Sequence, residues 1–176
     1  MGFNNIVNTA IDRLKKTIWD MDHKTRGIYV NWLDRHIKYL QNESSFSPSD
    51  HVTYKRGMVV HVDFGFRVDA EYGGFHWAVI VQNDNKAART VVVVPLSSVK
   101  KGQTTHRNDA DLGRIIGLNE NRAEGLLGQI TTISKMRIKI GTIYTLNDAQ
   151  LDEVDRKLIV RYTGPKYKKK LLKDNS

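Results

Sequence analysis

The chain contains no cysteine among its 176 residues. This absence excludes disulfide bonds and thiolate metal sites, and it is compatible with a reducing compartment. The sequence also lacks a run of eighteen apolar residues and an apolar run behind a basic start, so neither a membrane span nor a secretion signal is expected. We therefore expect a cytoplasmic protein with no membrane partner.

Acidic residues are outnumbered by basic ones. The chain has 28 Lys and Arg against 19 Asp and Glu, a formal net charge of +9. Much of the excess lies late in the sequence, where residues 164–176 form a lysine-rich basic tail. Such a tail either adds affinity for a nucleic-acid backbone through counterion release or is a solubilising end without a partner.

Apolar residues near the N-terminus recur at helical spacing on both sides of a polar break at residues 22–25. The spacing predicts a helical hairpin over residues 1–41. Two helices this short cannot build a core alone, so we expect them to pack on the rest of the chain or on a partner chain. The two apolar stripes are Val7, Ile11, Leu14, Ile18 and Met21, and then Tyr29, Leu33, Ile37 and Leu40.

Residues 42–53 lack periodicity and predict a linker, and the following stretch to residue 163 has a different composition. Asn147 is expected to cap a helix over residues 148–161, and residues 98–124 are predicted to form a long charged loop. Short strands with one closing helix predict an α+β fold built on a small SH3-like barrel. The predicted strands, rich in β-branched and aromatic residues, are 58–64, 77–82, 90–96, 126–133 and 138–144.

Four segments resemble the MazF/PemK toxins, in the right order and at plausible spacing. KRGMVVHVDF at 55–64 resembles their opening strand RGDIVWVDL, and EYGGFHWAVIVQND at 71–84 resembles their E-Q-G-G segment. TVVVVPLSS at 90–98 and LGQITTISKMRI at 127–138 resemble two later strands. The resemblance implies a CcdB/MazF-like SH3-like barrel with a C-terminal helix over residues 54–163. The N-terminal hairpin is then an extension to the family pattern.

The resemblance places the family's two active-site residues at His76 and Ser97, where Arg and Thr are usual. RNA cleavage by its own 2′-hydroxyl requires a proton acceptor, a proton donor and stabilisation of the phosphorane. Histidine suits both proton transfers, so His76 is the expected base or acid, with Ser97 and backbone N–H groups bonding the phosphate. Neither a metal nor another cofactor is expected. The alternatives are an ordinary strand-edge histidine and a hydroxyl bonded to its own backbone.

Seven further residues are candidates for RNA binding. The amide of Gln129 is suited to read a base edge or to satisfy neighbouring backbone. The ring of Tyr72, together with Trp77, is suited to stack on an unpaired base or to pack in the core. His106 and Glu71 lie in predicted loops, where solvated side chains are the alternative. The full set is Arg56, Arg67, Glu71, Tyr72, His106, Gln129 and Lys135.

The resemblance implies the toxin of a type II toxin–antitoxin system. Its expected activity is metal-independent, sequence-preferring endoribonuclease cleavage of single-stranded RNA, leaving 2′,3′-cyclic phosphates. The implied partners are single-stranded RNA, a cognate antitoxin protein and a second copy of the chain in a homodimer. Two alternatives remain open at this point. The exchange of Arg for His leaves a catalytically weak RNA-binding module, or the fold acts on a target protein.

Overall fold

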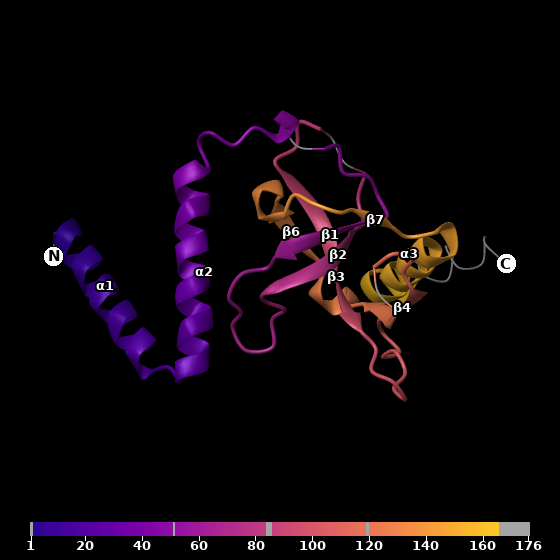
Figure 1. The fold of residues 1–176 in the computed structure, drawn as a ribbon, viewed down its shortest axis with the longest axis horizontal. Helices are drawn as coiled ribbons and strands as arrows, with labels where there is room; N and C mark the ends of the chain where they lie inside the picture. The colour runs from indigo at the N-terminus through magenta and orange to yellow at the C-terminus, as the bar shows by residue number, and fades with distance from the viewer. Residues whose placement is uncertain (1, 51, 84–85, 119, 166–176) are drawn as a thin grey trace. The chain divides into compact units, whose positions relative to one another are not determined.

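The computed structural model describes residues 2–50, 52–83, 86–118 and 120–165 (Figure 1). The chain divides into two compact units, Met1–Phe46 and Ser47–Ser176. All of the basic tail beyond residue 165 lies outside the described residues. No helix in the described ranges is both long enough and apolar enough to cross a lipid bilayer.

The first unit contains two helices, α1 (Phe3–Asp20) and α2 (His23–Asn42), which confirms the helices predicted near the N-terminus. Their turn is held by side chains that satisfy helix ends. Asp22 accepts hydrogen bonds from the N–H groups of Lys24 and Thr25, at 3.0 and 3.1 Å, and so caps α2. The Arg26 guanidinium donates to carbonyls at the end of α1. The two helices bury no residue against each other.

The second unit is a curled antiparallel sheet closed by α3 (Asp148–Tyr162), which confirms the predicted MazF-like α+β fold. The strand order is β4-β5-β3-β2-β1-β7, and β6 pairs with β3. The bounds are β1 Met58–Asp63, β2 Phe75–Ile80, β3 Thr90–Ser98, β4 Ala110–Arg114, β5 Arg122–Gly125, β6 Thr131–Ser134 and β7 Tyr144–Thr145.

Three predicted segments differ from the structure. The long charged loop at residues 98–124 contains a hairpin, β4 and β5, whose register shifts between Asp111 and Gly113. The strand predicted at 126–133 begins instead as a 3₁₀ turn, Leu127–Gln129, and becomes a strand only at Thr131. The prediction of a strand at 138–144 is wrong except at its two ends. Ile138 makes one isolated bridge with Val62, and Tyr144 begins β7. Between them Ile140 is 83% exposed and belongs to neither apolar cluster.

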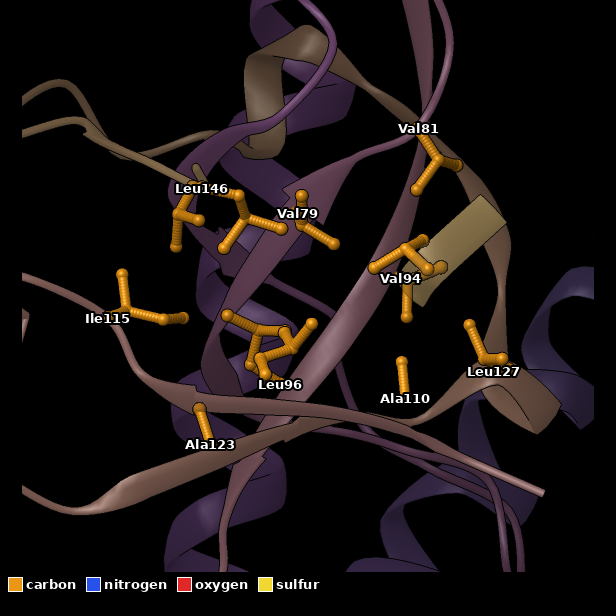
Figure 2. Packing of buried hydrophobic residues seen from close by; sticks show 12 residues of the cluster. Val79, Val81, Val94, Leu96, Ala110, Ile115, Ala123, Leu127 and Leu146 are labelled. Atoms are coloured by element: carbon orange, nitrogen blue, oxygen red, sulfur yellow. The ribbon is translucent and has the colours of Figure 1, made fainter. Parts of the chain in front are cut away.

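Two apolar clusters cover the two faces of β1, β2 and β3. Successive valines of β3 point to opposite faces, so Val93 belongs to one cluster and Val94 to the other. The strand β3 is therefore covered by apolar side chains on both of its faces. Figure 2 shows the cluster that β4, β5 and α3 complete, which includes Val79, Val94, Leu96, Ala110, Ile115, Ala123, Leu127 and Leu146.

The N-terminus of α3 carries a capping box. Asn147 Oδ1 accepts from the N–H of Gln150 at 2.9 Å, and Gln150 Oε1 accepts from the N–H of Asn147 at 3.0 Å. Asn147→Ala is expected to lower the free energy of unfolding by about 1 kcal/mol, because one N–H of the first turn loses its acceptor. Urea denaturation measures the change. Asp152→Ala, an exposed position in the same helix, is the control with an expected change within about 0.5 kcal/mol. Equal effects of the two substitutions would contradict the capping role.

Candidate active site

The candidate site lies where the sheet forks. β2 pairs with β3 only through Ala78–Ile80 and Val93–Pro95, and β3 then pairs with β5 through Leu96–Ser98. The ends of β2 and β3 therefore separate, and their residues line an open pocket of about 400 Å³, here called the central pocket. It is lined by His61, Tyr72, Phe75, His76, Trp77, Leu96, Ser97, Ser98, Leu118 and Ala123.

His76 is oriented by the phenol of Tyr72. The Tyr72 hydroxyl donates to the Leu96 carbonyl at 2.9 Å and lies 3.1 Å from Nδ1 of His76. Because a carbonyl can only accept, the phenol proton points to Leu96 and the phenol oxygen accepts from Nδ1 of His76. A neutral His76 therefore carries its proton on Nδ1 and has a lone pair on Nε2. The two rings are also in contact, with centroids 4.3 Å apart.

Burial changes the acid–base properties of three groups in the central pocket. It lowers the pKa of His76, although the Gly73 backbone carbonyl partly opposes this by favouring the protonated ring. Burial also lowers the pKa of His61, with further lowering by the charge of Lys139 and, when His76 is protonated, by its imidazolium. It raises the pKa of Tyr72, and the Glu124 carboxylate adds to that rise. At neutral pH the pocket therefore holds neutral imidazoles beside a protonated phenol.

Ser97 shares the central pocket with His76, as the resemblance implied. Its side chain is half-buried near the end of β3, and its register partner on β5 is Glu124. A hydroxyl can donate to a phosphate oxygen or accept from a neighbouring group. The structure thus brings an oriented imidazole and a hydroxyl to one open cavity.

Gln129 and Glu71 hold the loop that carries Tyr72. The Gln129 amide accepts from the Tyr72 N–H and donates to the Ala70 carbonyl, each at 3.2 Å. Glu71 Oε2 accepts from the Val68 N–H at 3.1 Å, within the same loop. The two bonds of Gln129 match the alternative that its amide satisfies neighbouring backbone. Together with the Glu71 bond they position the loop that carries Tyr72.

Two more open pockets meet the central pocket at Tyr72. One, of about 310 Å³, contains His106, Gln129 and Arg161, and is here called the helix-side pocket. The other, of about 320 Å³, contains Glu71, Gln129 and Arg137, and is here called the strand-side pocket. Five of the predicted RNA-binding and catalytic positions gather with Tyr72 around these cavities, namely Glu71, His76, Ser97, His106 and Gln129.

Three predicted RNA contacts lie elsewhere. Lys135, a candidate for RNA binding, is 0% exposed, and its Nζ lies 6.0 Å from the centre of the Tyr54 ring, so its side chain is not at the surface where RNA would bind. Arg56 forms an ion pair with Asp155, which ties the start of β1 to α3. Arg67 is exposed on the loop before β2 and lines none of the three pockets.

The central pocket also contains residues that the sequence did not single out. His61 and Phe75 come from β1 and β2, and their rings stack with centroids 5.5 Å apart. The one signal for His61 in the sequence is its position among the valines of a predicted strand, where a polar ring is unusual. Its partners became visible only with the register, which pairs His61 with Trp77.

The grouping of histidine and carboxylate side chains bears on whether the site could hold a metal ion. In the ranges that the structure describes, no three His, Asp or Glu side chains are grouped closely enough to hold a metal ion. Histidine and carboxylates are the protein ligands that a cysteine-free metal site would use.

Several solved structures are similar to this chain. MazF (Form-I) from Deinococcus radiodurans is 19% identical, with 61% of this chain and 94% of that chain covered and a TM-score of 0.47. An endoribonuclease from a mycobacterial species, in complex with its cognate antitoxin, is 18% identical, with 62% and 93% covered and a TM-score of 0.46. The Mycobacterium tuberculosis toxin MazF-mt6 is 15% identical, with 56% and 90% covered and a TM-score of 0.41. No curated protein sequence matches the chain.

A family model also matches the chain. The model describes a PemK-like, MazF-like toxin of a type II toxin–antitoxin system, and it matches residues 55–161. The match spans more than half of the chain, contains all the strands of the described sheet, and includes His76 and Ser97. The chain therefore belongs to the family of PemK-like, MazF-like toxins of type II toxin–antitoxin systems.

Proposed function

We propose that this chain is a toxin that cleaves single-stranded RNA in the central pocket without a metal ion. The observation that supports the proposal is the arrangement of His76, whose Nδ1 is fixed by Tyr72, in one open pocket with the Ser97 hydroxyl. The proposed cleavage leaves one RNA fragment with a 2′,3′-cyclic phosphate and one with a 5′-hydroxyl end.

The proposed chemistry uses Nε2, the ring nitrogen of His76 that does not face Tyr72. Nε2 takes the proton of the RNA 2′-hydroxyl, whose oxygen attacks the adjacent phosphorus. The Ser97 hydroxyl donates a hydrogen bond to a phosphoryl oxygen as charge builds on the phosphorane. The imidazolium that forms is a cation beside this charge, and its proton is available to the departing 5′-oxygen. General acid–base catalysis of this type contributes about 10²–10⁴-fold to the rate.

His76 stands where the MazF/PemK pattern usually has Arg, and this exchange changes the chemistry. Arginine stays protonated throughout the physiological pH range, so it stabilises charge but does not accept a proton. A half-buried histidine with a lowered pKa is neutral at pH 7 and able to accept a proton. Proton transfer by the side chain at position 76 is thus available to this chain.

The rate of cleavage should depend on pH through His76. Since the base form is required and burial lowers the pKa of His76 below its ordinary value of about 6.5, kcat/KM should rise with pH below that value and level off by about pH 7. Initial rates at low RNA concentration between pH 5 and pH 8 give the profile. In His76→Arg this acidic limb should disappear. A wild-type rate that falls as the pH rises through this range would show that the protonated ring is required instead.

The partners of the site follow from the family. We propose that RNA contacts Tyr72, Glu71, Gln129 and His106 around the three pockets, and that an antitoxin protein covers them in the inhibited state. We also propose that two copies of the chain form a homodimer that acts in the cytoplasm, where mRNA is found. Arg161 and Arg137 add positive charge to the helix-side and strand-side pockets.

The residues used in this chemistry lie within the unit Ser47–Ser176. We propose that residues 54–163 form the catalytic domain and that residues 1–41, joined by the linker at 42–53, are an extension outside the chemistry. The linker prediction is supported by the end of α2 at Asn42 and by the single 3₁₀ turn, Pro48–Asp50, that follows.

Incubation of the purified chain with a long single-stranded RNA in EDTA tests the proposed function. We expect discrete cuts whose upstream fragments end in 2′,3′-cyclic phosphates, at the same positions with and without the chelator. A folded protein that binds the RNA and leaves it intact would be a binding module, and the exchange of Arg for His would then be a loss of catalysis.

A further inference from the structure

A row of aromatic rings borders the central pocket and has no part in the chemistry proposed above. The Phe75 ring stacks on His61, with centroids 5.5 Å apart and planes at 29°. His61 lies 5.0 Å from Trp77, and Trp77 lies 5.1 Å from Tyr144 in an edge-to-face contact. We call Phe75, His61, Trp77 and Tyr144 the aromatic ladder. It crosses β2, β1 and β7, which are neighbouring strands.

Phe75 is the exposed end of the ladder. It is 41% exposed on a strand whose later residues, Ala78 to Ile80, are fully buried. One side of its ring is held by His61, and the ring lines the open central pocket together with His76 and Ser97. Trp77 and Tyr144, at the other end of the ladder, pack against the apolar cluster of Figure 2. The ladder therefore contacts one face of an aromatic ring that is itself partly exposed.

His61 contributes a neutral ring to this ladder. Burial, followed by the positive charge of Lys139, lowers the pKa of His61, so the ring is uncharged near neutral pH. A neutral imidazole between Phe75 and Trp77 extends the stack without bringing a charge into it. The surface offered at Phe75 is thus a flat π system beside the hydroxyls of Ser97 and Ser98.

A nucleobase matches this combination of a flat ring and nearby polar groups. Bases stack on aromatic side chains, each contact is worth roughly 1–3 kcal/mol, and every base has a face to offer. Because Phe75 shares its pocket with His76 and Ser97, a base on Phe75 would belong to a nucleotide next to the cleaved phosphate. We propose that the aromatic ladder, through Phe75, is the stacking subsite for one unpaired base beside the scissile bond, an inference that rests on the proposed function.

The first test changes the protein. Affinity is measured by fluorescence anisotropy with an oligonucleotide whose mapped cut site carries a 2′-deoxy sugar, so that binding is separated from cleavage. Phe75→Leu should weaken binding by about fivefold to a hundredfold, whereas kcat on the cleavable RNA should stay within about twofold. Phe75→Tyr should bind like wild type. Ile140→Ala, at an exposed apolar residue that lines none of the three pockets, is the control and should have no effect.

The second test changes the RNA. An abasic nucleotide is placed at each position near the cut in turn. One position should weaken wild-type binding by the same factor as Phe75→Leu, and it should weaken the Phe75→Leu variant no further, because both changes remove the same contact. Additive losses at every position would overturn the stacking subsite. So would a change in oligomeric state of Phe75→Leu, by size exclusion, that accounts for the weaker binding.

The tests separate this inference from the proposed function. If wild type cuts RNA but Phe75→Leu binds as tightly as wild type, the subsite is overturned and the proposed function stands. If wild type cuts nothing, the abasic scan is run along a bound oligonucleotide; one position coupled to Phe75 would then show that Phe75 stacks on a base although cleavage fails.

Discussion

Replacing His76 with alanine is expected to lower kcat for RNA cleavage by about 10²–10⁴-fold, with RNA affinity and stability almost unchanged. The substitution removes the proposed proton acceptor, Nε2, and leaves the bond from the Tyr72 hydroxyl to the Leu96 carbonyl in place. His76 is only half-buried, so the smaller side chain opens the pocket without emptying the core. Single-turnover cleavage at saturating protein measures the chemical step, and thermal unfolding confirms the fold.

Two variants sharpen this prediction. His106→Ala removes an exposed histidine from the helix-side pocket and should leave kcat within a few-fold of wild type. His76→Arg restores the side chain usual in MazF/PemK toxins, and we expect it to keep part of the activity while losing the acidic limb of the pH profile. Cleavage by His76→Ala at nearly the wild-type rate would contradict a base at this position.

Replacing Tyr72 with phenylalanine is expected to lower kcat/KM by about tenfold to a hundredfold. The change deletes one oxygen atom, which bridges Nδ1 of His76 and the Leu96 carbonyl at 3.1 and 2.9 Å. Without it the imidazole loses the bond that fixes its tautomer, and a buried carbonyl loses its donor, a cost of about 1–3 kcal/mol. Nitrogen NMR of labelled histidine should show His76 changing from a protonated Nδ1 to a mixture of tautomers.

Tyr162→Phe is the matched control for Tyr72→Phe. The Tyr162 hydroxyl also donates to a backbone carbonyl, that of Leu127 at 2.5 Å, with no contact to His76. This variant should lose a similar amount of stability, about 1 kcal/mol, and keep its cleavage rate. Equal losses of activity in the two variants would assign Tyr72 a general structural role and contradict its action through His76.

The parts of the fold that the sequence predicted have strong periodicity. The apolar stripes near the N-terminus have the spacing of a helix, the residues of β3 are mostly β-branched, and the Asn147 cap marks the start of α3. The site could be predicted because the resemblance gave positions on two different strands, 76 and 97. The structure brings both to one pocket, and no spacing along the chain could have shown that.

The parts that the sequence did not predict depend on tertiary contacts. β4 and β5 lie in a charged stretch whose composition is typical of a loop. In the structure two of these charged residues, Arg122 and Asp111, form an ion pair across the hairpin. Their register shift beside Gly113, whose φ is +57°, also breaks the alternating pattern. The burial of Lys135, a candidate for RNA binding, is a further example. It arises from packing around the 3₁₀ turn Lys135–Arg137, which the sequence does not predict.

The aromatic ladder also depends on tertiary contacts that the sequence does not reveal. His61 and Phe75 are fourteen positions apart, and only the register of β1 against β2 places their rings in contact. The Gln129 amide, predicted to read RNA, bonds instead to the backbone of residues 70 and 72, because the loop before β2 folds back onto it. These bonds position Tyr72, and a direct contact of Gln129 with RNA stays a prediction.

The most direct test of this account is cleavage of one short RNA in EDTA, compared with the same RNA carrying a single 2′-deoxy sugar at the mapped cut. The account predicts that wild type binds both equally, cuts the first to a 2′,3′-cyclic phosphate and leaves the second intact at that position. Cutting of the deoxy substrate at the same bond, or cutting that stops when EDTA is added to the parent RNA, would contradict metal-free attack by the 2′-hydroxyl in the central pocket.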